Sequence, residues 1–280
     1  MRACIIGLGR MGRGGIAINL VNRGGYVVYG YDVNKSVYMT LSNAGVKTVD
    51  SVEQCSDADY VILALPTGKE STQVLGELGT NAVVIDTTTM SLTELEQVLS
   101  IVRKSGFRYI TARLEGGPKQ AESGSLVMFI GGDEQLYKQS EEFLRQLGTP
   151  PIYIGTHEQA TLLKLISTSI IIANTMILAE LSPLMKDVGL DTNTLVKALS
   201  MSGADSAQLR TRLPWILSGN YPESFSIDLA KYVVDETIKH SMSKGRSLPI
   251  MSMIDKLLEI TKNEGKGKMD FSEVAEMLKL

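Results

Sequence analysis

The first 32 residues constrain the fold more than any other stretch of the chain. The apolar run Ala3–Ile6 leads into Gly7-Leu8-Gly9-Arg10-Met11-Gly12. An apolar, helix-like segment follows to Val21, and a second apolar run ends at Asp32. Strand, glycine turn, helix and strand in this order predict a βαβ unit.

The glycines of this turn are typical of a site for a dinucleotide. Gly7 permits the tight turn, Gly9 lets a pyrophosphate approach bare backbone, and Gly12 lets the helix pack close to the strand. The helix N-terminus offers unpaired N–H groups and the positive end of the helix dipole to phosphates. The alternative is a turn whose glycines serve backbone conformation only.

Asp32 ends the second strand near the offset of about 20 residues at which an acid accepts the ribose hydroxyls of the adenosine. A 2′-phosphate there would meet an anion, so the sequence favours NAD over NADP. Lys35, three residues later, weakens that preference.

The composition excludes several other classes of protein. The 280 residues are 44% hydrophobic and 21% charged, an ordinary balance for one or two soluble domains. The net charge of −3 shows no bias toward nucleic acid or acidic membranes. Cys4 and Cys55 are too few and too ill-placed for a disulfide framework or a metal site, which fits a reducing cytoplasm.

Two further features favour a cytoplasmic protein. The N-terminus enters a strand directly, without a signal-like apolar core after a basic region. The longest apolar stretch, around Leu162 to Leu184, is interrupted by polar residues, so we interpret it as a buried helix and not as a membrane span.

Strands and helices alternate after Asp32, which predicts an α/β fold with a doubly wound parallel Rossmann sheet over residues 1–156. The ligand crevice of such a sheet lies at the carboxyl ends of its strands. Gly7, Asp32, Pro66 and Thr87–Thr89 all fall there. The expected strands are Tyr60–Leu65, Ala82–Asp86, Phe107–Leu114, Leu126–Ile130 and Ile152–Ile154, with helices near 34–44, 91–104 and 134–147.

From His157 onward the pattern is helical only, which predicts an all-α domain over residues 157–280. A long helix, 158–187, joins the two domains, with Pro183 in its last turns and Gly189 after its end. Further helices are expected near 191–200, 206–218, 226–244, 249–263 and 271–279. His157 and His240 are isolated from other ligand types, so no metal site is expected.

Lys164 is the candidate catalytic residue. It lies early in the long helix among apolar neighbours, so its stem is expected to be at least partly buried. Burial disfavours the ammonium and lowers the pKa from its reference of about 10.4, toward the range useful for proton exchange. The alternative is a solvated lysine whose stem lies along the surface.

The ordered motifs resemble those of the β-hydroxyacid dehydrogenases, which include 3-hydroxyisobutyrate dehydrogenase, tartronate semialdehyde reductase and 6-phosphogluconate dehydrogenase. The resemblance runs through nearly the whole chain. One departure is an extra residue between Gly12 and the following Ala17. The matching segments are Gly7–Gly12, Leu65-Pro66, Asp86–Thr89, Gly116-Gly117, Lys164, Gly189–Asp191, Phe225–Lys231 and Gly267–Ser272.

The resemblance implies an NAD(P)-dependent oxidoreductase that transfers a hydride between nicotinamide and a small β-hydroxy acid or semialdehyde. Lys164 would be the general acid/base, and the enzyme would be a homodimer or homotetramer. The implied cofactor residues are Gly7, Leu8, Gly9, Arg10, Met11, Gly12, Asp32, Leu65, Pro66, Thr89 and Lys231, with Thr89 at the nicotinamide half. The implied substrate residues are Glu115, Gly116, Gly117 and Thr168.

The substrate side departs from the family pattern. Glu115 replaces a serine, Thr168 an asparagine and Gln120 a glycine. A carboxylate at position 115 would repel a carboxylate ligand, so we hypothesise that Glu115 recognises a cationic or polyhydroxylated group. Alternatively it points to solvent or pairs with Lys119 or Arg113. An imine or amine reductase and a cofactor-binding regulator without turnover are the other hypotheses.

Overall fold

The computed structural model describes residues 1–23 and 25–278, without the side chains of residues 13 and 14. The chain separates into two compact units, Met1–Lys164 and Leu165–Leu280. The boundary between these units falls inside the long helix α7 (His157–Asp187), whereas the sequence predicts a domain boundary at 156/157.

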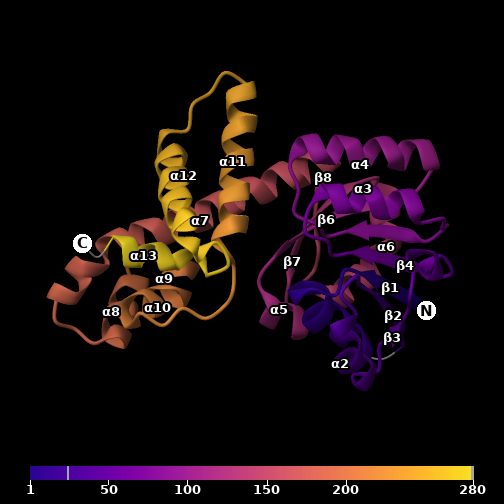
Figure 1. Ribbon diagram of the computed structural model, residues 1–280, viewed down its shortest axis with the longest axis horizontal. Coiled ribbons are helices and arrows are strands. Elements are labelled where there is room, and N and C mark those ends of the chain that lie inside the picture. The colour runs from indigo at the N-terminus through magenta and orange to yellow at the C-terminus, as the bar shows by residue number, and fades with distance from the viewer. Residues whose placement is uncertain (24, 279–280) are drawn as a thin grey trace. The chain divides into compact units, whose positions relative to one another are not determined.

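The first unit contains an eight-stranded sheet with the order β3-β2-β1-β4-β5-β6-β7-β8 (Figure 1). Part of this order, 3-2-1-4-5-6, is that of a doubly wound dinucleotide-binding fold, whose crevice opens where the order reverses, between β1 and β4. The strands are β1 (Arg2–Ile6), β2 (Val27–Tyr31), β3 (Lys47–Thr48), β4 (Tyr60–Leu63), β5 (Val83–Asp86), β6 (Arg108–Glu115), β7 (Val127–Gly132) and β8 (Ile152–Gly155).

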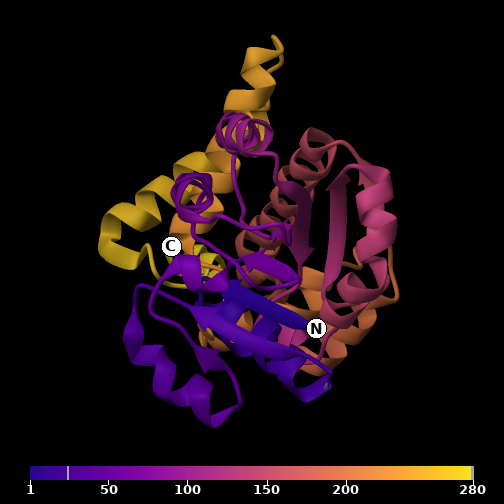
Figure 2. The same ribbon diagram turned by 90° about the vertical axis from the view of Figure 1, so that its right-hand side faces the viewer.

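Helices cover both faces of this sheet, as Figure 2 shows. Ala3 and Ile5 of β1 pack into one core with residues of the first helix and of α6 (Glu134–Leu147). Cys4 and Ile6 pack into the other core with α3 (Gly68–Glu77) and α4 (Leu92–Ser105). This burial on both faces explains the continuous apolar runs of the central strands. The helical segments of the unit are η1 (Arg10–Ala17), α1 (Ile18–Arg23), η2 (Lys35–Val37), α2 (Tyr38–Asn43), η3 (Val52–Cys55), α3 (Gly68–Glu77), α4 (Leu92–Ser105), α5 (Pro118–Glu122) and α6 (Glu134–Leu147).

The fold class is confirmed, but the sheet is not wholly parallel. β6 and β7 pair antiparallel, with Glu115 opposite Val127. Only residues 116–126 join the two strands, and they hold the short helix α5. A parallel crossover needs a dozen or more residues, so this connection can only return the chain antiparallel.

The dinucleotide helix begins with π-helical turns, Arg10–Ala17, before it continues as α1. A π-helical turn holds more residues than an α-helical one. The wider turns therefore accommodate the extra residue that separates Gly12 from Ala17 in comparison with the family pattern.

The expectation that the two cysteines are ill-placed for a disulfide is wrong. Cys4 in β1 and Cys55 in η3 are bonded to each other, with their Cα atoms 5.6 Å apart. Both side chains point into the core on the α3 and α4 face of the sheet, which brings them together. Cysteine usage therefore gives no support for a reducing compartment, and a cytoplasmic location stays a prediction.

The second unit is helical throughout its described residues. It contains most of α7, followed by α8 (Thr192–Ser200), α9 (Ala207–Thr211), α10 (Leu213–Ser218), α11 (Ile227–Ser243), α12 (Pro249–Thr261), η4 (Lys262–Lys266), η5 (Phe271–Glu273) and α13 (Val274–Met277). Pro183 lies within α7, which continues to Asp187. The helix predicted over 206–218 is two helices that meet at Arg212.

A buried ion pair links the C-terminal part of the second unit to the helices that precede it. Arg212 donates to both carboxylate oxygens of Asp270, each at 3.0 Å. The same carboxylate accepts from the backbone N–H groups of Phe225 and Ser272. Asp270 therefore joins three segments that are far apart in the sequence.

Helix α7 is long and apolar enough, by length and composition alone, to cross a membrane. Core helices of soluble proteins have the same properties. Ile172 and Met176 of α7 are buried against α11 and α12, as in such a core helix.

Candidate functional site

The glycine turn has the geometry that a bound dinucleotide requires. Gly7 has a φ of +97°, which favours glycine, and its N–H donates to the Tyr31 carbonyl at 2.9 Å. A Cβ on Gly12 would lie 1.9 Å from the Gly7 carbonyl oxygen, so only glycine allows this close approach. A Cβ on Gly9 would meet nothing within 4 Å, and Gly9 is exposed. The backbone of the turn is therefore accessible, as a pyrophosphate site must be.

Asp32 follows β2 directly and supports this turn. One carboxylate oxygen accepts from the Leu8 N–H at 2.6 Å, and the other accepts from the Asn34 N–H at 2.7 Å. Lys35 is engaged elsewhere, because its Nζ lies 2.7 Å from the Tyr38 hydroxyl and 4.0 Å from the Asp50 carboxylate. Asp32 thus places a negative charge beside the turn, and Lys35 has partners of its own.

Hydrogen bonds join the loops that follow β4 and β5. The Leu65 N–H donates to the Thr88 hydroxyl oxygen at 3.2 Å, and the Thr88 N–H donates to Asp86 at 2.8 Å. Leu65 and Thr89 are half-buried and Pro66 is exposed. The two loops are therefore held side by side at the carboxyl edge of the sheet.

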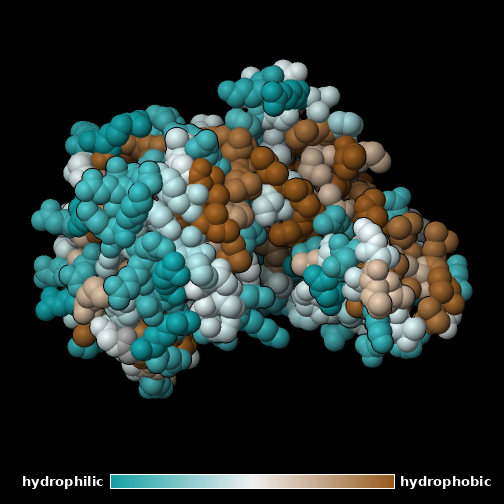
Figure 3. Space-filling view, turned by 180° about the vertical axis from the view of Figure 1, so that it is seen from behind, coloured by the Kyte–Doolittle hydropathy of each residue, from teal (hydrophilic) through white to brown (hydrophobic). Residues whose placement is uncertain are grey.

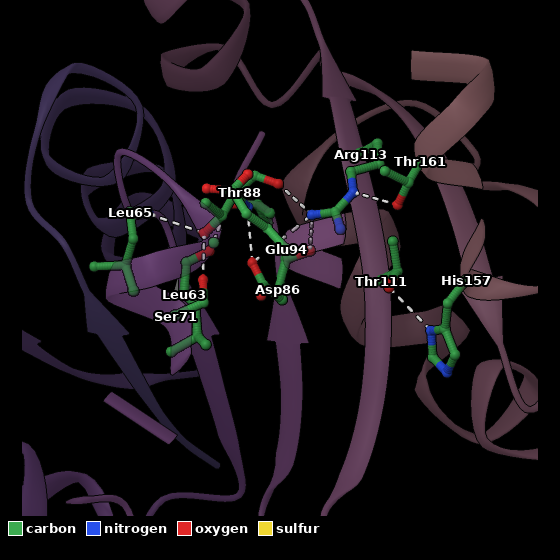
Figure 4. A network of polar contacts seen from close by, with 12 residues as sticks. Leu63, Leu65, Ser71, Asp86, Thr88, Glu94, Thr111, Arg113, His157 and Thr161 are labelled. Carbon is green, nitrogen blue, oxygen red and sulfur yellow. Dashed lines mark hydrogen bonds and ion pairs between the residues drawn. The ribbon is translucent and has the colours of Figure 1, made fainter. Parts of the chain in front are cut away.

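Arg113 is the centre of a buried polar network that the sequence analysis did not identify (Figure 4). Its side chain is only 1% exposed. Nε donates to the Thr161 hydroxyl at 3.1 Å, and Nη1 donates to the Thr88 carbonyl and lies 3.8 Å from the Asp86 carboxylate. Arg113 therefore connects the loop after β5 to the first turns of α7. The signal for it was a charged residue within the mostly apolar stretch Tyr109–Leu114.

Asp86 is fully buried and is held from two sides. The Tyr109 hydroxyl donates to it at 2.7 Å, in addition to the Thr88 N–H. Burial, reinforced by the Asp86 charge, raises the pKa of Tyr109 well above its ordinary value. Tyr109 is therefore a hydrogen-bond donor to Asp86 at any physiological pH.

Lys164 forms an ion pair with Glu115. Nζ lies 3.2 Å from Oε1, and the two side chains are 14% and 15% exposed. Burial lowers the pKa of Lys164; the Glu115 carboxylate opposes that shift, and Arg113 adds to it. Glu115 therefore pairs with Lys164, neither with Lys119 nor with Arg113 as the sequence suggested, and it does not point freely to solvent.

In the loop after Glu115, a backbone N–H group is hydrogen-bonded to a side chain of the same loop. Gly116 has a φ of +119°, and the Gly117 N–H donates to Oε1 of Gln120 at 3.0 Å. The helix that begins there, α5, packs against the dinucleotide helix. A Cβ on Gly15 would lie 1.8 Å from the Ala121 Cβ, so this contact requires the glycine.

His157 has a structural environment. Its Nδ1 lies 2.9 Å from the Thr111 hydroxyl, and its ring packs on Tyr109 with 5.5 Å between centroids. Burial lowers the pKa of His157. The neutral imidazole is therefore favoured.

Thr168 and Lys231 lie in the second unit, and their side chains differ in burial and in polar partners. The Thr168 hydroxyl is buried and has no hydrogen-bond partner among the described residues. Lys231 lies 2.9 Å from Asp235 and 2.7 Å from Asp255. Burial tends to lower the pKa of Lys231, but the two carboxylates outweigh it and raise the pKa. Lys231 is therefore a charged, doubly paired lysine.

The sheet order and the glycine turn define a dinucleotide-binding unit, and a helical unit follows it. A family model for the NAD binding domain of 6-phosphogluconate dehydrogenase matches residues 2–155, and one for the NAD-binding region of NADP-dependent 3-hydroxyisobutyrate dehydrogenase matches residues 159–278. The chain belongs to the family of 3-hydroxyisobutyrate dehydrogenase and related β-hydroxyacid dehydrogenases.

Named relatives span almost the whole chain. The chain is 24% identical to 2-(hydroxymethyl)glutarate dehydrogenase of Eubacterium barkeri, covering 96% of this chain and 92% of that protein. It is 26% identical to 3-sulfolactaldehyde reductase of Escherichia coli, with coverage of 98% and 95%. The Mycobacterium tuberculosis 3-hydroxyisobutyrate dehydrogenase structure with L-serine has a TM-score of 0.86 at 22% identity, covering 100% and 99%. The chain is an NAD(P)-dependent enzyme of the hydroxyacid dehydrogenase class.

Proposed function

We propose that the enzyme transfers a hydride between NAD(P) and a small β-hydroxy acid or semialdehyde, with Lys164 as the general acid/base. The observation that carries this role is the largely buried ammonium of Lys164, whose pKa is lowered by burial and which has one carboxylate partner. A lysine with a lowered pKa exchanges protons more readily at neutral pH than a solvated one.

The cofactor would be held by the turn Gly7–Gly12, by Asp32, and by the loops with Leu65, Pro66 and Thr89. The open backbone at Gly9 and the close fit at Gly12 suit a pyrophosphate at the start of the helix. NAD(P), when bound, supplies the hydride in reduction and accepts it in oxidation. Lys231 would contribute from the second unit, and Thr168 would line the substrate side.

In reduction, the Lys164 ammonium gives a proton to the carbonyl oxygen, which becomes the hydroxyl of the product. In oxidation the neutral amine takes the hydroxyl proton. Glu115 stabilises the ammonium between these events, since its charge lies 3.2 Å away. Arg113 holds the loop after β5 against α7, so it positions the helix that carries Lys164.

Asp32 favours NAD over NADP in this proposal. A 2′-phosphate near its carboxylate would be repelled, and Lys35 is already bound to Tyr38. Titration of the protein with NADH and NADPH measures the preference. Asp32→Ser should bring the Kd for NADPH closer to the Kd for NADH. Asp57→Ser, which removes an exposed carboxylate from the turn before β4, should leave the ratio of the two Kd values unchanged.

The role of Lys164 is tested with Lys164→Met. We expect turnover to fall by about 10²-fold or more, the usual contribution of a general acid/base, with little change in the Kd for the cofactor. Lys104→Met, which alters an exposed helix lysine, is the matched control. Equal turnover in Lys164→Met and in the wild type would show that Lys164 is not the general acid/base.

We also propose that the enzyme is a homo-oligomer that assembles through α7. Exposed apolar residues follow one side of this helix in the second unit: Ile166, Ile170, Ile177, Leu181 and Leu184. Figure 3 shows apolar side chains gathered on the surface seen from behind. Contiguous apolar surface of this kind usually marks an interface. Light scattering should give a dimer or tetramer, and Ile170→Glu should shift the mass toward the monomer.

A further inference from the structure

Side chains of β6 contact the first turns of α7 at three places. The contacts join the Thr111 hydroxyl to Nδ1 of His157 (2.9 Å), Nε of Arg113 to the Thr161 hydroxyl (3.1 Å) and the Glu115 carboxylate to Nζ of Lys164 (3.2 Å). Figure 4 shows the first two. Alternate residues share one face of a strand, and residues three or four apart share one side of a helix. The three contacts therefore set the position of α7 along β6 and, with it, the position of Lys164.

Arg113 reaches further than the other two side chains. Besides its contact with α7, its guanidinium contacts the loop after β5, where Nη1 donates to the Thr88 carbonyl and lies 3.8 Å from the Asp86 carboxylate. The Thr88 hydroxyl accepts from the Leu65 N–H at 3.2 Å, so the loop after β4 is joined to the same network. One side chain therefore links both loops at the carboxyl edge of the sheet to the helix that carries Lys164.

Packing alone does not account for a buried arginine at this position. The side chain is 1% exposed, its carboxylate partner lies 3.8 Å away, and Nη2 has no hydrogen-bond partner among the described residues. A buried donor without an acceptor is costly, and an apolar side chain of similar volume often replaces a buried ion pair without loss of stability. The charge of Arg113 is therefore better explained by the site beside it than by the stability of the sheet.

The charge of Arg113 also acts on Lys164. Burial is the main cause of the lowered pKa of Lys164; the Glu115 carboxylate opposes that shift, and the Arg113 guanidinium adds to it. The other charged or titratable groups around this network are Asp86 of β5, Tyr109 of β6, His157 of α7 and, as Figure 4 shows, Glu94 of α4. Arg113 and Glu115 thus shift the proton equilibrium of Lys164 in opposite directions.

We propose that Arg113 is a positioning residue that couples the two halves of the reaction: it holds the loop with Thr88 and Thr89, on the side of the nicotinamide, and Lys164, on the side of the proton, in one arrangement. The inference rests on the proposed hydride transfer and extends it to a residue that touches neither cofactor nor substrate. The guanidinium acts in two ways that variants can separate, through its hydrogen bonds to Thr161 and Thr88 and through its charge.

Thr161→Val tests the hydrogen bonds. It removes the acceptor on α7, keeps the charge of Arg113 and leaves the buried pair with Asp86 intact. Because a small misplacement of reacting groups slows a reaction strongly, kcat for the best substrate in a panel of small β-hydroxy acids should fall ~10-fold. KM, the Kd for NADH and the pH profile should change little. Thr175→Val is the matched control, because its buried hydroxyl donates to its own helix at Ile171, and it should behave as the wild type does.

Arg113→Gln tests the charge. Loss of a neighbouring positive charge favours the Lys164 ammonium, so the neutral amine that oxidation requires forms at higher pH. The rise of kcat/KM with pH should therefore move to higher pH. Arg113→Lys keeps the charge, but one ammonium cannot replace a planar fork that donates to two segments, so kcat should fall without that move. Arg108→Gln, at an exposed arginine of the same strand, is the control and should leave the profile in place.

A wild-type kcat in Thr161→Val and in Arg113→Lys would overturn the proposal, as would a pH profile of Arg113→Gln that stays in place or moves to lower pH. If Arg113→Gln does not fold, the other two variants decide. The pKa of Lys164 is also measured without turnover, by NMR of protein with 15N-labelled lysine, in which Lys164→Met identifies the signal by its loss. Arg113→Gln should raise this pKa, and an unchanged value contradicts the proposal. Failure of the proposed function is a different result: the wild type would bind NADH and oxidise none of the acids.

Discussion

Replacing Glu115 by glutamine should lower the pKa of Lys164 further. The substitution keeps the shape of the side chain and removes the charge that stabilises the ammonium at 3.2 Å. With an effective dielectric constant of about 20, two charges at that separation interact by about 5 kcal/mol. One pKa unit corresponds to about 1.36 kcal/mol, so the upper limit of the decrease is between about 3 and 4 units.

The observed decrease will be smaller than this limit, because water and neighbouring dipoles rearrange around the amine; we expect at least ~1 unit. The assay is the pH dependence of kcat/KM, which reports the pKa of the free enzyme. In the oxidation direction the neutral amine is active, so the rate rises with pH. Glu115→Gln should move that rise to lower pH.

Glu122→Gln is the control for this experiment, because it makes the same charge change at an exposed carboxylate on α5, the short helix that follows Glu115 in the chain. Its profile should coincide with that of the wild type. If the pH profile of Glu115→Gln is unchanged or moves to higher pH, Lys164 in its ion pair with Glu115 is not the group whose titration the profile reports.

Three further predictions concern stability and cofactor binding. Gly12→Ala places a methyl group 1.9 Å from a carbonyl oxygen of the turn, so calorimetry should show the loss of NADH binding. The pKa of His157 in the folded protein is lowered from 6.5, so just below pH 6.5 the unfolded state binds more protons than the folded state. The wild type should therefore lose stability as the pH falls through 6.5, and His157→Gln should not show this loss. The measurement is the difference in Tm between the two proteins at each pH. Asp270→Asn leaves the buried Arg212 charge without its counter-ion and should lower the free energy of unfolding by about 3 to 5 kcal/mol in urea denaturation.

The elements that follow from local pattern were predictable. The βαβ unit, the buried strands and the long helix are present, because apolar periodicity and glycine position report directly on backbone structure. The burial of Lys164 also agrees with its apolar neighbours in the sequence. β3 was not predicted, since Lys47 and Thr48 carry no apolar pattern.

Contacts between distant segments were not predictable in the same way. Cys4 and Cys55 meet only because η3 packs on the face of β1 that carries Cys4. Glu115 meets Lys164 only once β6 and α7 are in place. The antiparallel pairing of β6 and β7 had a usable signal, the short connection between them, which the alternation of strands and helices obscured.

The most direct test of the central claim is transfer of a labelled hydride. The protein is incubated with nicotinamide cofactor carrying deuterium at the transferable position and with a panel of small aldehydes, and the products are analysed by mass spectrometry. The account predicts an alcohol with one deuterium on its carbinol carbon, formed by the wild type and lost in Lys164→Met. Tight cofactor binding with no labelled alcohol from any aldehyde would contradict it and would favour a cofactor-binding regulator.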